Sequence, residues 1–153
     1  MSSNNITEAR RFLYESKIKE IPFDLNFYNP RNSINYDGIF ENAKYLEKIK
    51  SIHHQEGSTS YQKVESMSEM FLNCFRLREL PTLYNFTNNL DIIKPFLGFA
   101  SVFDGCHSLR KIPKELLSKM VSSGNDQGSY YEAYYNTYNS CYALNELIGL
   151  PVP

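Results

Sequence analysis

Apolar residues recur along the chain at intervals of three and four, and the whole pattern returns about every 30 residues. When the copies are aligned, a column of large aromatic residues contains Phe40, Phe71, Phe103 and Tyr138. The column three residues later holds Ala43, Cys74, Cys106 and Cys141. The next two apolar columns hold Leu46, Leu77, Leu109 and Leu144, and then Ile49, Leu80, Ile112 and Leu147.

These columns predict the same local structure in every copy. Val64, Met67, Phe71 and Cys74 follow the helical interval and would form one face of a short helix. Residues 77–83 then suit a short strand, because Pro81 cannot continue a helix. A single copy cannot bury both faces, whereas stacked copies can. We therefore expect an α/β repeat solenoid, with a short helix and a short strand per unit and a parallel sheet on one face.

The spacing of the columns divides the chain into an N-terminal segment, residues 1–32, and four units, residues 33–60, 61–92, 93–127 and 128–153. The N-terminal segment carries a weaker copy, with Phe12 in the aromatic column. It would serve as a cap or as an anchor to another protein. The units differ in length within polar joints such as 53–60 and 122–129, where turn residues cluster.

The three cysteines occupy one core column, and Ala43 in the same column indicates that a small apolar group is required there. A ligand or nucleophile role is the alternative, but no His or carboxylate recurs beside them. We expect a repeat core formed by Phe40, Phe71, Cys74, Leu77, Leu80, Phe103, Cys106, Leu109, Ile112, Tyr138, Cys141, Leu144 and Leu147.

One exposed column alternates in charge at every step, and its members are Glu20, Lys48, Glu79, Lys111 and Glu146. Neighbouring strands lie about 4.8 Å apart, so these side chains would face one another when the strands pair in register. Opposite charges in such positions stabilise a sheet, whereas like charges destabilise it. We interpret the column as a structural charge ladder, with chance alternation as the alternative.

Two groups of residues are candidates for partner binding. Arg78 and Arg110 share the column before the ladder and would form a small anion-preferring spot, unless they are simply solvated. Tyr130, Tyr135 and Tyr142 are left outside the core columns of a tyrosine-rich stretch. Exposed tyrosines suit a protein or glycan contact, and ordinary surface tyrosines are the alternative.

Composition excludes several other classes of function. The 16 Lys and Arg residues balance 17 Asp and Glu residues and are not clustered, which argues against a nucleic-acid surface. No segment has the apolar length of a membrane span, and the N-terminus lacks a signal-peptide pattern. We expect His53 and His54 to be solvated, with no metal site, no cofactor and no catalytic residues. The chain is therefore expected not to be an enzyme.

The order Met70-Phe71-x-x-Cys74-x-x-Leu77-x-x-Leu80-Pro81, repeated as Val102-Phe103-x-x-Cys106-x-x-Leu109-x-x-Ile112-Pro113, resembles BspA-like leucine-rich repeats. It is also similar to the repeats of mycoplasma surface lipoproteins and of bacteriophage virion proteins. The resemblance covers about residues 33 to 153. It implies a curved, leucine-rich-repeat-like fold used for binding or assembly, without enzymatic activity.

The resemblance favours a structural protein of a phage particle, such as a tail, fibre or head appendage, assembled in the host cytoplasm and acting in assembly or host contact. The alternative is a bacterial surface adhesin or a protein-binding module on the cell surface. The chain ends at 150–153 within its last expected strand and without a polar cap. We expect this exposed C-terminal sheet edge to pair with a protein partner or a second copy, and a host surface protein or glycan to be a further partner.

Overall fold

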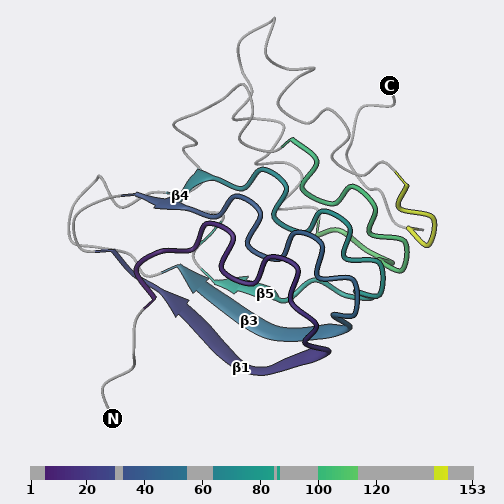
Figure 1. Ribbon diagram of the computed structural model, residues 1–153, viewed down its shortest axis with the longest axis horizontal. Coiled ribbons are helices and arrows are strands. Elements are labelled where there is room, and N and C mark those ends of the chain that lie inside the picture. The colour runs from purple at the N-terminus through teal and green to yellow at the C-terminus, as the bar shows by residue number, and fades with distance from the viewer. Residues whose placement is uncertain are drawn as a thin grey trace, which may run out of the picture.

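The computed structural model describes residues 6–29, 33–54, 64–84, 86, 100–113 and 140–144. These residues form five strands, which are β1 (Glu20–Phe27), β2 (Ile34–Asn35), β3 (Lys48–His54), β4 (Val64–Ser66) and β5 (Thr82–Tyr84). Two small sheets result, one in the order β1-β3-β5 and the other pairing β2 with β4, and every pairing is parallel. We call the β1-β3-β5 sheet the strand layer (Figure 1).

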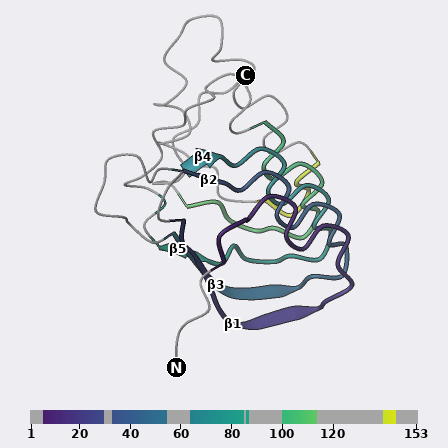
Figure 2. The ribbon, with the colours of Figure 1, turned by 60° about the vertical axis from the view of Figure 1, so that its left-hand side comes forward.

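Opposite the strand layer the chain forms consecutive β-turns, which we call the turn layer: residues 9–16, 36–46, 67–77, 100–109 and 140–144. Within a segment, alternate N–H groups bond three residues back, as from Ile39 to Tyr36 at 3.3 Å and from Ala43 to Phe40 at 2.9 Å. The intervening N–H groups bond to the next segment, as from Phe40 to the Met70 carbonyl at 3.0 Å. Figures 1 and 2 show these segments running side by side.

The predicted α/β repeat solenoid, with a helix in each unit, is wrong. The described residues contain no helix, and hence none with the length and apolar character needed to span a bilayer. A helix needs negative φ throughout, whereas Gly38 (φ 61°), Asn42 (φ 59°), Glu69 (φ 57°) and Asn73 (φ 58°) lie in the left-handed region. Consecutive turns also return a side chain to the core every third or fourth residue, so their apolar spacing imitates that of a helix.

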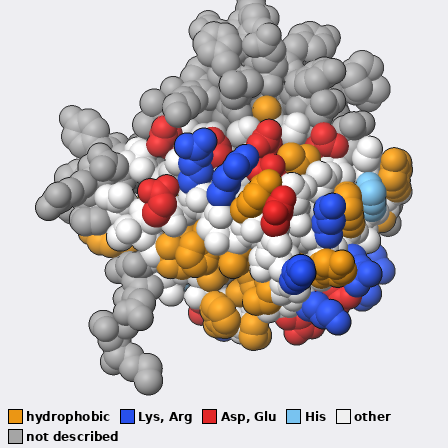
Figure 3. Space-filling model, viewed as in Figure 1, with side chains coloured by type: hydrophobic (Ala, Val, Ile, Leu, Met, Phe, Trp, Pro, Cys, Tyr) orange, Lys and Arg blue, Asp and Glu red, His pale blue; other side chains and the backbone are white. Residues whose placement is uncertain are grey.

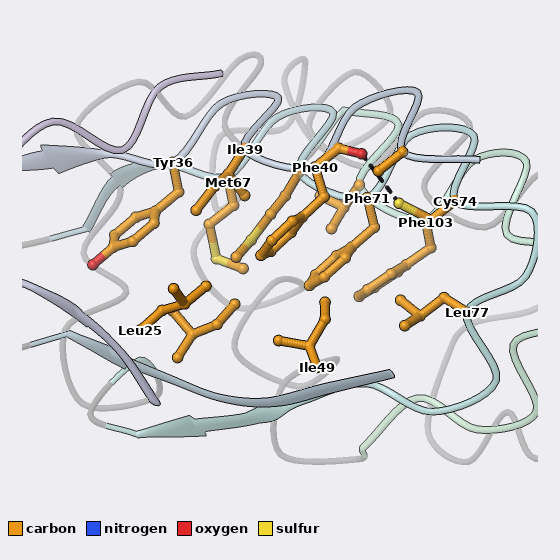
Figure 4. Close-up of a cluster of buried hydrophobic side chains, with 14 of the residues drawn as sticks. Leu25, Tyr36, Ile39, Phe40, Ile49, Met67, Phe71, Cys74, Leu77 and Phe103 are labelled. Atoms are coloured by element: carbon orange, nitrogen blue, oxygen red, sulfur yellow. Dashed lines mark hydrogen bonds between the residues drawn. The ribbon is translucent and has the colours of Figure 1, made fainter. Parts of the chain in front are cut away.

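The hydrophobic core lies between the two layers. Phe40, Phe71 and Phe103 descend from successive turn segments as a parallel stack, with ring centroids 5.4 Å and 5.9 Å apart. Ile49 approaches these rings from the strand layer, and Leu25 lies further along the same layer toward one end of the core (Figure 4). All five side chains are buried. The aromatic column of the sequence thus becomes one continuous stack of rings that links three turn segments.

The first turn segment is offset by one residue from the sequence alignment. Leu13, rather than Phe12, takes the position of Phe40, because its N–H bonds to the Ile39 carbonyl at 2.8 Å as Phe40 bonds to Met70. Phe12 is 44% exposed and contacts the edge of Phe27. The placement of Phe12 in the aromatic column was therefore wrong.

Candidate binding surface

A row of stacked side chains follows the outer corner where the turn segments lead toward the strand layer. The Phe75 and His107 rings are parallel with centroids 4.6 Å apart, and Tyr142 continues the stack 5.1 Å from His107. At the other end the Lys44 ammonium lies 5.7 Å from the centre of the Phe75 ring. We call Lys44, Phe75, His107 and Tyr142 the aromatic ridge.

The stacking of the turn layer positions this ridge. The Ala143 N–H donates to the His107 carbonyl at 3.2 Å, and the Ser108 hydroxyl donates to the Phe75 carbonyl at 2.8 Å, so consecutive segments stay in register. Tyr142 is nevertheless 79% exposed. Figure 3 shows hydrophobic, basic and histidine side chains side by side at the right-hand edge, where the turn segments bend toward the strand layer.

A second pair widens this corner. The Arg76 guanidinium lies 5.3 Å from the centre of the Tyr45 ring, one residue further along each segment than the ridge. Both side chains are exposed. A cation above an aromatic face contributes about 0.5–1 kcal/mol at such sites.

Beside the ridge, an open hollow of about 500 Å³ lies where the turn segments enter the strand layer. Arg78 and Arg110 line it together, and the Arg110 N–H donates to the Arg78 carbonyl at 3.2 Å. The other charged residues that line it are Glu20, Glu47, Lys48, Lys50 and Glu79. The hollow therefore combines both signs of charge within a small space.

Part of the expected charge ladder can be located around this hollow. Glu20 and Lys48 are register partners of β1 and β3, and Glu79 lines the hollow beside them. Lys111 lies in the following segment and is exposed, whereas Glu146 falls outside the described residues. The contribution of the ladder to stability stays a prediction.

Further along the strand layer, Asp24, Ser51 and His53 form a polar cluster. The Ser51 hydroxyl donates to Asp24 Oδ1 at 2.5 Å, and His53 Nε2 lies 3.1 Å from Ser51 Oγ. The hydrogen bond from Ser51, together with the Lys50 ammonium at 3.3 Å, holds the pKa of Asp24 below its ordinary value. The hydrogen bond between Ser51 and Asp24, together with their pairing in register, joins β1 to β3.

The sequence reading missed that cluster because its members lie on different strands. Asp24 and Ser51 are register partners, but the register shifts between Ile21 and Asp24, so an alignment of copies by equal spacing places Asp24 opposite Ile52 instead. His54 was also misjudged: it is fully buried rather than solvated. Its Nδ1 lies 2.7 Å from the Tyr36 hydroxyl, and burial raises the pKa of Tyr36 well above its ordinary value.

Each cysteine thiol donates to the carbonyl of the aromatic residue in the preceding segment. The S–H groups of Cys74, Cys106 and Cys141 reach the carbonyls of Phe40, Phe71 and Phe103 at 3.2, 3.1 and 3.0 Å, and the first bond is the dashed line in Figure 4. Burial raises the pKa of all three thiols, that of Cys141 to about 12. Such thiols are poor nucleophiles and poor metal ligands. Within the described ranges, no His, Cys, Asp and Glu side chains gather into a metal-binding group.

The remaining expected residues divide into three groups. The residues of the repeat core that are buried are Phe40, Phe71, Cys74, Leu77, Phe103, Cys106, Leu109 and Ile112. Those partly buried against the core are Leu80, Cys141 and Leu144. Those that lie outside the described residues are Tyr130, Tyr135, Tyr138 and Leu147.

Comparison with known proteins returned no relative. No family model matches the chain, and no curated protein or solved structure is detectably similar to it.

Proposed function

We propose that this chain is a non-enzymatic structural or binding protein and that a protein partner contacts the aromatic ridge. The observation that carries the proposal is the surface stack of half-buried Phe75 with exposed His107 and Tyr142, which has cations at its Phe75 end, Lys44 and Arg76. Aromatic and arginine side chains are the types enriched at protein interfaces, and they dominate binding energy there.

The exposure of Tyr142 supports this proposal more than the stacking does. Ring stacking between segments also stabilises the turn layer, and that alone would explain the half-buried Phe75. Tyr142 is different, because most of its ring faces water and gains little from the fold. An apolar surface that remains exposed to water at the end of a row of stacked rings suits a contact completed by another molecule.

The place where the protein acts is proposed only from its resemblance to known repeats. A structural part of a phage particle, such as a tail, fibre or head appendage, remains the leading proposal, and a bacterial surface adhesin the alternative. Both roles need a contact surface and no reaction. The ridge serves either role, because protein surfaces and glycans both pack against exposed aromatic rings.

Site-specific photo-crosslinking tests the ridge in the cell that makes the protein. A benzoylphenylalanine in place of Tyr142 replaces one exposed aromatic residue by another, so the fold should be kept. We expect a covalent adduct of one defined mass, whose partner is identified by mass spectrometry. An adduct that sediments with assembled particles would support the virion role, and one recovered at the cell surface would support the adhesin role.

The matched control places the same group at Phe23, which is also exposed and aromatic but lies on β1, away from the ridge. Equal adducts from both positions would contradict the proposal, since they would reflect collision rather than a site. A Tyr142→Ala substitution should also weaken binding of the identified partner by about tenfold. Unchanged affinity would assign the contact to another surface.

A further inference from the structure

We propose that the hollow beside the ridge is a binding site for a carboxylate-bearing peptide segment, with Arg78 and Arg110 as its anchors. The site is distinct from the ridge, and the inference stands whether or not the ridge binds a partner. Arginine is the side chain best suited to this task, because its planar guanidinium can hold a carboxylate with two parallel hydrogen bonds.

The backbone brings the two arginines together. The hydrogen bond from the Arg110 N–H to the Arg78 carbonyl joins their segments at the position of these residues. Both side chains are exposed and line the same hollow. Two guanidinium groups on neighbouring segments can therefore act on one ligand, or on carboxylates at adjacent places along a peptide.

Neither guanidinium is used in an ion pair with another described residue. The ion pairs in the described part of the chain join Arg11 to Glu41, and Lys50 and His53 to Asp24. Glu47 and Glu79 line the same hollow but do not pair with Arg78 or Arg110. The donors of both arginines are thus available to a ligand.

The charges around the hollow favour a peptide over a polyanion. Glu20, Glu47 and Glu79 stand among the four cations, and they would repel a sulfated glycan or a phosphate-rich chain along its length. A peptide presents its carboxylates singly and can place lysine or hydroxyl groups against the glutamates. Charge complementarity therefore identifies a mixed-charge, acidic peptide segment as the occupant.

Fluorescence anisotropy with the full chain and a labelled peptide of Glu, Ser and Lys residues, with Glu in excess, tests the site. We expect the Arg78→Gln/Arg110→Gln variant to bind this peptide at least about tenfold more weakly than the wild type. Raised salt should weaken wild-type binding, because the contacts are ionic and exposed. A heparin-derived oligosaccharide serves as the second probe and is expected to bind more weakly than the peptide.

The matched control is Arg10→Gln/Lys17→Gln, which removes two exposed positive charges away from the hollow. This control variant should bind the peptide as tightly as the wild type does. An equal loss of affinity in both double variants would overturn the proposal, because it would show that peptide binding depends only on the net charge of the protein. Stronger binding of the oligosaccharide would overturn the choice of a peptide. Thermal melts of both variants verify that folding is kept, and Tyr142→Ala, which alters only the ridge, should leave peptide binding unchanged.

Discussion

The turn layer and the strand layer enclose one core, but their neighbouring segments are joined by different patterns of backbone hydrogen bonds. In the strand layer, β3 pairs in parallel with β1 and β5, and the β1 pairing has one shift in register between Ile21 and Asp24. In the turn layer, only alternate N–H groups reach the next segment, and the others close turns within their own. The strand layer thus depends mainly on which side chains face inward, whereas the turn layer also depends on residues that tolerate positive φ.

The turn layer meets that requirement unevenly. Gly38 and Gly105 adopt positive φ without strain, and Asn42 and Asn73 tolerate it well. The other positive-φ positions hold residues for which this conformation is unfavourable, namely Arg11, Glu15, Glu69, Ser101 and Ser140. Each of these stores strain of about 1 kcal/mol, which the packing beneath must offset. The turn layer is therefore where backbone conformation and core packing are most closely coupled.

Loss of the central ring should have the largest effect. Phe71→Ala removes the middle of the Phe40–Phe71–Phe103 stack and leaves a cavity under strained turns. We expect a loss of about 4 kcal/mol in the free energy of unfolding, measured by urea denaturation.

Phe75→Ala is the matched comparison, since Phe75 is only half-buried and lies in the ridge. It should cost about 1 kcal/mol or less, because one stacking contact and little buried area are lost. Equal losses for the two variants would show that the buried stack does not hold the turn layer together.

A methyl group at Gly105 tests the backbone requirement itself. Gly105 has a φ of 73°, and a Cβ there would meet Asn73 Oδ1 and approach Asn73 Cα at 3.3 Å. We expect Gly105→Ala to cost about 2 kcal/mol, read from the thermal midpoint. Adding Asn73→Gly removes the oxygen that is struck, so the double variant should lose less than the two single effects combined. Strict additivity would show that strain alone, without the contact, causes the loss.

These contrasts explain what could be predicted from the sequence. Stacked segments need equal apolar groups at equal positions, so the alignment located Phe40, Phe71 and Phe103 in one column. The turns were mistaken for helices because positive φ has a clear signal only at Gly and Asn, and Glu69 and Ser101 give none.

The candidate surfaces were visible to different degrees. Arg78 and Arg110 could be grouped from their shared column, and the structure brings them together in one hollow. The ridge also occupies one column, but its residue types change from Lys44 to Phe75, His107 and Tyr142. A search for repeated identity cannot find a column that is held together by stacking between unlike side chains.

Glu41 tests the electrostatics of the turn layer. It is buried, its Oε2 accepts no hydrogen bond from the described residues, and Arg11 lies 3.6 Å away. Burial, with the Glu69 charge as a further cause, raises the pKa of Glu41 above its ordinary value of 4.5. The folded state therefore favours the protonated acid, so ionisation costs stability as the pH rises from the unfolded pKa through the folded pKa.

Glu41→Gln should accordingly stabilise the protein by about 1 kcal/mol at pH 7, since a neutral amide replaces a poorly solvated carboxylate. The advantage should disappear in acid, below about pH 4, where both states of the wild type bind the proton. Chemical denaturation at both pH values measures it, with exposed Glu8→Gln as the control for net charge. A stabilisation that persists in acid would assign the effect to packing instead.

The smallest effect is expected in the strand layer, at the charge ladder. Continuing the Ser51–Thr82 register back by three residues puts Glu79 beside Lys48, so Glu79→Lys places two like charges together. We expect a loss of about 0.5 kcal/mol, with Glu79→Gln losing about half as much. High salt should abolish both losses, because these side chains are exposed and screened. Differential scanning calorimetry of the wild type, Glu79→Lys and Glu79→Gln at low and high salt measures these losses. Identical melting temperatures for all three proteins would indicate that the charges alternate by chance.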